Sequence, residues 1–174
     1  MNVGFMNSPQ MMPPSASYNS VAHDMYRSAV RRGSLKRLAS RFTRRPAHLD
    51  ELDNFSCLAS RHDGGVRMVP IEAITGSEGR ASDFDRDFNP LSRHTKERWV
   101  RIAEARLKGE SLPAVQLIKV GDIYYVRDGH HRISVSRALG QKTVDAEVIV
   151  WQGSDDCPIG YLQKFPYDCC PVAA

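Results

Sequence analysis

The chain has 174 residues and is 41% hydrophobic, which suits one compact domain with a real core and extra segments at its ends. No apolar run reaches the roughly 20 residues of a membrane-spanning helix, and the first residues lack the apolar centre of a secretory signal. The net charge of +4 is unevenly distributed, because residues 1–50 have a balance of +6 and the remaining residues one of −2. The basic composition is therefore no argument that the main domain binds nucleic acid.

Residues 1–17 are rich in Met, Pro, Ser and Asn without periodicity, which predicts disorder. From Tyr18 the apolar spacing is helical, so residues 18–66 are expected to form a basic helical arm and a connector. The cations of this arm are Arg31, Arg32, Lys36, Arg37, Arg41, Arg44 and Arg45. They can contact nucleic acid, an anionic membrane or an acidic partner, or the apolar stripe can pack on the domain while the charges stay in solvent. Of the external partners we expect nucleic acid rather than a membrane.

Residues 48–65 predict an irregular or short helical connection that ends in two glycines, and Arg67–Ile71 predicts the first strand. After Glu72 comes a polar loop. Its Ser77, Gly79 and Arg80 could place backbone donors and a guanidinium near a phosphate, although a plain surface turn fits equally well. The loop is not a Walker loop, because the Gly-Lys-Ser/Thr ending is absent.

The alternating carboxylates of Asp83, Asp85 and Asp87 lack the glycine and the distal glutamate of a calcium-binding loop. Their neighbours Phe84 and Phe88 indicate local anchoring instead. We therefore expect no dedicated metal site here.

The second half of the chain alternates helical and extended patterns. Thr95 is expected to cap a helix whose core stripe is Trp99, Ile102, Ala103 and Leu107. Strands are predicted over 114–120 and 124–126, joined as a hairpin by Gly121-Asp122, and over 144–150 as a half-buried strand. A helix is predicted from residue 130 to Gly140. The fold class is therefore α+β, a small mixed sheet with packed helices, in a main domain of residues 67–151.

Residues 152–174 indicate an irregular tail, with three prolines. The four cysteines are Cys57, Cys157, Cys169 and Cys170. Their spacing matches no zinc pattern, and adjacent cysteines rarely pair with each other. We expect reduced thiols in a cytoplasmic protein, with a labile disulfide from Cys157 to the tail as the alternative.

The most informative stretch is Asp128-Gly129-His130-His131-Arg132, where a strand passes into a helix. The N–H groups and the positive dipole end of a first helical turn favour anions. Arg132 adds a planar fork for phosphate oxygens, and His130 and His131 can donate hydrogen bonds or carry protons. The pattern indicates phosphate chemistry, most simply that of a nucleotide. The alternative is a capping Asp128, a tight turn at Gly129 and solvated histidines.

The order of elements is a helix, Leu112-Pro113, a strand, a Gly turn, a strand, the Asp-Gly-His-His-Arg helix, Leu139-Gly140 and a Val-x-Ala-x-Val strand. Over about residues 68–151 it resembles the ParB/sulfiredoxin-like superfamily, and most closely its stand-alone ParB-like proteins. The resemblance implies a nucleotide such as ATP, ADP or CTP, with Mg²⁺ as a further cofactor. It implies phosphate contacts from Gly129, His130, His131 and Arg132 and from the loop with Ser77, Gly79 and Arg80. A second copy of the chain is a further expected partner.

The chain also departs from relatives in this superfamily. Sulfiredoxins place a reactive cysteine where this chain has His130, and partitioning ParB proteins have Gly-Glu-Arg-Arg and additional domains. The motif is closer to that of free-serine kinases, in which a carboxylate after the first strand acts as base. By that similarity Glu72 would be the base, Asp128 an alternative base or metal contact, and His130 a contact to the transferring phosphoryl group. The expected functions are a phosphotransferase, a nucleotide hydrolase or a nucleotide switch. The alternatives are a non-catalytic scaffold and a nucleic-acid-associated protein that binds through its arm.

Overall fold

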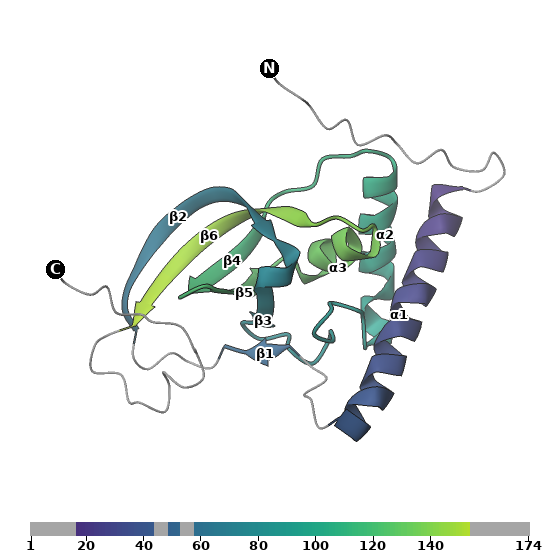
Figure 1. Ribbon diagram of the computed structural model, residues 1–174. Helices are drawn as coiled ribbons and strands as arrows, with labels where there is room; N and C mark the ends of the chain where they lie inside the picture. Colours follow the sequence, from purple (N-terminus) through teal and green to yellow (C-terminus); the bar gives the residue numbers. More distant parts are fainter. Residues whose placement is uncertain (1–16, 44–48, 53–57, 154–174) are drawn as a thin grey trace, which may run out of the picture.

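The computed structural model describes residues 17–43, 49–52 and 58–153. The helices are α1 (Tyr18–Thr43), α2 (Lys96–Leu107) and α3 (His130–Ala138), with short 3-10 turns at Ile71–Ala73 and Arg93–Thr95 (Figure 1). The strands are β1 (Asp50–Glu51), β2 (Leu58–Pro70), β3 (Ile74–Ser77), β4 (Val115–Val120), β5 (Ile123–Asp128) and β6 (Thr143–Gly153). Among these residues no helix is both long and apolar enough to cross a membrane.

The six strands form one mixed sheet in the order β1-β3-β5-β4-β6-β2. β3 lies parallel to β1 and β5, and β4 lies parallel to β6. β4 and β5 form the antiparallel hairpin expected at Gly121-Asp122, and β2 pairs antiparallel with β6. The predicted α+β class with a small mixed sheet is therefore confirmed.

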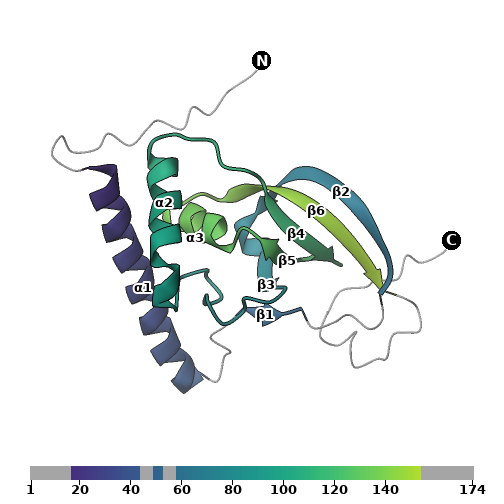
Figure 2. The ribbon, with the colours of Figure 1, turned by 180° about the vertical axis from the view of Figure 1, so that it is seen from behind.

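The three helices lie on the same side of the sheet, with α1 outermost (Figures 1 and 2). α3 contacts β4 and β6, α2 contacts α3, and α1 contacts α2. The main core lies between the sheet and α3, and a second cluster joins the three helices around the fully buried Trp99. The stripe predicted for α2 is confirmed, since Trp99 and Ala103 are buried and Ile102 and Leu107 pack against them.

The prediction of an irregular connection over 48–65 is wrong for residues 58–65, which belong to β2. The two glycines that indicated a loop instead form an irregularity within the strand. Pairing with β6 shifts register between Asp63 and Val66, and the Asp63 carboxylate accepts the N–H of Gly65. A long partner strand thus extends β2 through a sequence that carries turn residues.

The loop expected over Gly76–Arg80 begins after Ser77, because Gly76 and Ser77 lie in β3, a strand that was not predicted. A Cβ atom on Gly76 would come within 2.3 Å of the Tyr125 ring and 2.6 Å of the Asp50 carbonyl oxygen. Glycine at this position therefore permits close strand packing rather than a turn.

Thr95 does not cap α2 as predicted. Its backbone is already helical, and its hydroxyl donates to the Ser92 carbonyl at 2.7 Å instead of accepting a helix N–H. A short 3-10 turn before α2 takes the place of the cap. Most of the disorder expected over 1–17, most of the irregular tail expected over 152–174 and all four cysteines lie outside the described residues. The tail begins later than predicted, because Gln152 and Gly153 belong to β6.

Candidate functional site

The carboxyl ends of β3 and β5 meet at one edge of the sheet, because the two strands are parallel and adjacent. Ser77 ends β3, Asp128 ends β5, and α3 begins two residues later. Gly129 makes the turn with φ 105°, and a Cβ there would lie 2.6 Å from Val115 Cγ1. This tight turn places the amino-terminal end of α3 beside the Ser77–Arg80 segment.

His130 is buried and fixed by Ser77. Their Nε2 and Oγ atoms are 2.7 Å apart, and Ser77 Oγ also accepts the backbone N–H of Arg80 at 3.1 Å. Phe84 stacks on the imidazole, with ring centroids 5.9 Å apart. Burial, followed by the charge of Arg80, lowers the pKa of His130 to about 4. His130 is therefore a neutral imidazole near pH 7.

His131 is also buried and contacts the same Phe84 ring edge-on at 5.3 Å. Burial lowers its pKa to about 4, with further contributions from the charges of Arg98 and Arg80. Its Nδ1 atom is buried and has no hydrogen-bond partner among the residues that the structure describes. Two neutral imidazoles thus line the start of α3.

A cavity of about 160 Å³ opens at this helix terminus. It is lined by Arg80, Arg98, Ile102, Arg127, Asp128, Gly129, His130, His131 and Arg132. The guanidinium groups of Arg80 and Arg98 are exposed, and within the described ranges neither forms an ion pair or a side-chain hydrogen bond. Arg127 differs, since it pairs with Glu78 at 3.4 Å. Two unneutralised cations therefore flank the amino-terminal turn of α3.

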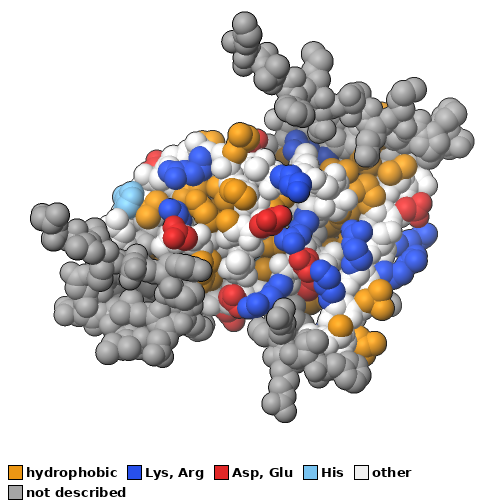
Figure 3. Space-filling view, viewed as in Figure 1, with side chains coloured by type: hydrophobic (Ala, Val, Ile, Leu, Met, Phe, Trp, Pro, Cys, Tyr) orange, Lys and Arg blue, Asp and Glu red, His pale blue; other side chains and the backbone are white. Residues whose placement is uncertain are grey.

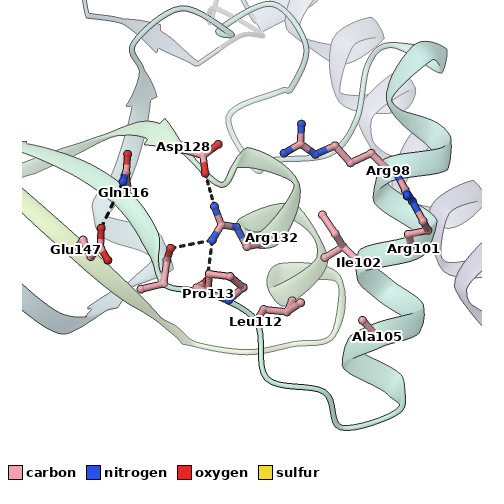
Figure 4. Close-up of a pocket in the computed structure, with 11 residues that line it drawn as sticks. Arg98, Arg101, Ile102, Ala105, Leu112, Pro113, Gln116, Asp128, Arg132 and Glu147 are labelled. Carbon is pink, nitrogen blue, oxygen red and sulfur yellow. Dashed lines mark hydrogen bonds and ion pairs between the residues drawn. The ribbon is translucent and has the colours of Figure 1, made fainter.

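Arg132 does not extend a free fork into this cavity. Its Nη1 donates to the carbonyl oxygens of Pro113 at 2.7 Å and Ala114 at 2.8 Å, and its Nη2 pairs with Asp128 (Figure 4). A guanidinium has five N–H donors, so these three contacts leave two for a ligand. The first role of Arg132 is to tie α3 to the segment that precedes β4.

A larger cavity of about 620 Å³ adjoins the first, and the two share Arg98, Ile102, Asp128 and Arg132. Its apolar wall comes from α2 and the segment before β4, and Arg98 and Arg101 extend from α2 on the side opposite Arg132 (Figure 4). The cavity combines this apolar wall with charged and polar side chains, and its volume lies in the range of small-molecule sites.

The structure brings together most of the residues that the sequence indicated. Ser77, Arg80 and the 128–132 motif meet at one edge, and Gly79 lies exposed in the same segment. Glu72 lies apart, because it is exposed in the 3-10 turn before β3, at the opposite end of that strand. Arg98 and Arg101 were missed. The signal that could have found them is their place on the predicted helix, since Arg101 lies opposite its core stripe and Arg98 lies one turn before Ile102 at the edge of that stripe.

Asp128 is the carboxylate on the smaller cavity, and Glu147 lines the larger one. Within the described part of the chain, no group of three or more His, Cys, Asp or Glu side chains could form a metal site. Mg²⁺ commonly uses one or two carboxylates together with substrate phosphates, and Asp128 suits that mode.

The arm cations Arg31, Arg32, Lys36 and Arg37 are exposed along α1, and Lys36 pairs with Asp87. Arg41 lies in the last turns of the same helix. Arg44 and Arg45 fall outside the described residues.

Comparisons with known proteins find similarity to a solved structure but to no family model. No family model matches the chain, and a search of curated proteins gave no match. Among solved structures, the chain is similar to sulfiredoxin from Arabidopsis thaliana. The two are 20% identical over 48% of this chain and 82% of that one, with a TM-score of 0.34. At this identity and TM-score the similarity carries no argument about family or chemistry.

Proposed function

We propose that the protein binds a nucleotide and places its phosphates at the amino-terminal end of α3. The observation that carries the proposal is the pair of unneutralised arginines, Arg80 and Arg98, beside the free N–H groups of that helix. The buried imidazoles of His130 and His131 stay neutral, so they accept or donate hydrogen bonds there without adding charge.

The larger cavity supports a ligand with an organic body rather than inorganic phosphate alone. It adjoins the phosphate position and has an apolar wall that includes Ile102 and Leu112. A nucleotide has both parts, a polyanionic tail and a flat aromatic base whose faces can lie against an apolar wall. ATP, ADP and CTP are the candidates that the sequence resemblance implies.

A phosphotransferase or hydrolase reaction at this site would use Asp128 as the base or the Mg²⁺ contact. Asp128 lines both cavities, whereas Glu72 lies at the far end of β3, so we do not assign the reaction to Glu72. His130 would contact the transferring phosphoryl group as a neutral ligand.

Titration calorimetry with ATP, ADP and CTP, with and without Mg²⁺, tests the binding. Arg98→Ala should weaken affinity at least about tenfold, because one charge-assisted phosphate contact contributes about 1.5 kcal/mol or more. Lys142→Ala, which removes an exposed cation remote from the cavities, is the matched control. Equal affinities for the wild type and Arg98→Ala would refute the phosphate position.

Turnover is tested separately with Asp128→Asn. If the protein transfers or hydrolyses phosphate, this variant should lose turnover while it keeps nucleotide affinity within a few fold. No turnover in the wild-type protein, with binding intact, would assign the site to a nucleotide switch or a scaffold.

A further inference from the structure

Helix α1 presents two opposite faces, only one of which is packed. Ala22, Tyr26 and Ala29 are buried against α2, and Gly33 approaches Asn89 so closely that a Cβ would lie 3.1 Å from that side chain. At 3.6 residues per turn, the face opposite this stripe carries Arg27, Arg31, Leu35 and Leu38. The leucines are 66% and 55% exposed.

After Asp24, all the charged side chains of α1 are basic. From residue 25 to residue 43 the sequence has six Lys or Arg and no Asp or Glu. Arg31, Arg32 and Arg37 form no ion pair within the described ranges. Arg27 has only a solvent-exposed partner, Asp24, at 3.4 Å, and such pairs contribute little. In Figure 3, Lys and Arg side chains gather on the side of the molecule that α1 and α2 form.

We propose that the outward face of α1 binds the phosphate backbone of duplex nucleic acid, at a surface separate from the nucleotide cavities. A helix of 26 residues is roughly 39 Å long, which is comparable with one turn of B-form DNA. On this face Arg27 and Arg31 lie one turn apart and Arg32 lies at its edge, so more than one phosphate can be contacted at once.

The side chains of this face favour a duplex over the other polyanions. Single strands are commonly bound on stacked aromatic side chains, and the described outward side chains from Arg27 to Leu38 include none. An interfacial helix needs a continuous apolar face, whereas Leu35 and Leu38 are the two large exposed apolar side chains beyond Tyr18 among the α1 side chains that the structure describes. Contacts to phosphates alone imply binding without sequence preference.

Fluorescence anisotropy with a labelled duplex two helical turns long, at a series of salt concentrations, tests this proposal. Affinity should fall linearly on logarithmic axes as salt rises, because bound cations release condensed counterions. Arg27→Ala/Arg31→Ala removes the two cations of the outward face, so the slope should become shallower by about 1.8. Arg67→Ala/Lys142→Ala makes the same charge change on exposed residues outside α1 and should leave the slope unchanged.

Two further variants separate the alternatives. Arg98→Ala should keep duplex affinity within twofold, since it belongs to the nucleotide cavity. Leu35→Ala/Leu38→Ala should also leave the slope unchanged. The proposal is overturned if the wild type does not bind the duplex at low salt, or if both charge variants change the slope equally. Binding to phosphatidylglycerol vesicles gives the second test. The proposal is also overturned if the wild type binds these vesicles but not the duplex, and if Leu35→Ala/Leu38→Ala abolishes the vesicle binding.

Discussion

Gly129 is constrained both by its backbone angle and by its neighbours. Its φ of 105° is costly for other residues, and a Cβ would overlap Val115 at 2.6 Å. Gly140 also has a positive φ, of 76°, but a Cβ there would meet nothing within 4 Å. Gly140→Ala should therefore cost about 1–3 kcal/mol of unfolding free energy, and Gly129→Ala clearly more. Urea unfolding measures both, and equal losses would contradict the close approach to Val115.

The two buried histidines make stability depend on pH. Their pKa is about 4 in the folded protein, below the ordinary value of 6.5, so the unfolded chain binds protons more readily. Stability should be full above about pH 6.5, should fall as pH drops towards about 4, and should lose roughly 3 kcal/mol per histidine in that window. Urea midpoints across this range measure the loss.

His131→Leu is the companion variant, because it leaves His130 as the single depressed imidazole of the pair. Its loss of stability towards pH 4 should be about half that of the wild type. A wild-type profile that is flat between about pH 6.5 and 4.5 would show that neither imidazole is kept neutral by burial.

The local motif in the sequence was sufficient to locate the site. It was not sufficient to identify every arginine at the site or the groups to which each arginine donates. A strand end, a glycine and the cationic start of a helix are adjacent in the chain, so local sequence rules are sufficient to predict the turn at residues 128–132. The contacts of Arg132 with Pro113 and Ala114 span 19 and 18 residues, and no local pattern encodes them. Arg98 reaches the site only because α2 packs beside α3.

At the scale of elements, the segment between β3 and α2 supports the site. The buried Asp85 carboxylate accepts the N–H groups of Asp87 and Asn89 at 2.9 and 2.8 Å. These bonds shape the turn that presents Phe84 to both histidines. Asp85 thus serves as the internal acceptor of this turn, and Phe84 and Phe88 are buried, in agreement with the anchoring expected from the phenylalanines.

Asp85→Ala should lose about 2–3 kcal/mol of stability or more, because it leaves buried N–H groups without acceptors. Nucleotide affinity should fall with it, since Phe84 would no longer support the imidazoles. Asp83→Ala is the control, because among the described residues the Asp83 carboxylate pairs only with the exposed His94, at 3.6 Å. Thermal unfolding with and without nucleotide separates the two effects, and similar melting temperatures for both variants would count against the proposed role of Asp85.

Element type followed periodicity where the pattern was long, as in α2 and β6. It failed where glycine had a packing role. Gly64 and Gly65 lie within β2, and Gly76 lies within β3 under the Tyr125 ring. Turn chemistry and close strand contact select the same residue, so the sequence alone could not distinguish them.

At the scale of the whole molecule, α1 belongs to the folded body rather than to a detachable arm. Ala22, Tyr26 and Ala29 complete the cluster around Trp99, and the Tyr26 ring lies 5.5 Å from the indole. Removing the helix would expose that cluster. Functional tests of its cations therefore need substitutions on the outward face rather than truncation.

Two substitutions that add the same charge to α1 test this view. Ala29 is 1% exposed, so Ala29→Glu would bury an unpaired carboxylate against α2 and should cost about 3 kcal/mol or more. Leu35→Glu, on the opposite face, should change the unfolding free energy by no more than about 0.5 kcal/mol. Urea unfolding followed by tryptophan fluorescence measures both stabilities, since Trp99, one of the two tryptophans, contacts Tyr26 edge-on. Equal stabilities would mean that α1 is a loosely attached arm, and a large loss in Leu35→Glu alone would mean that the packed and outward faces are reversed.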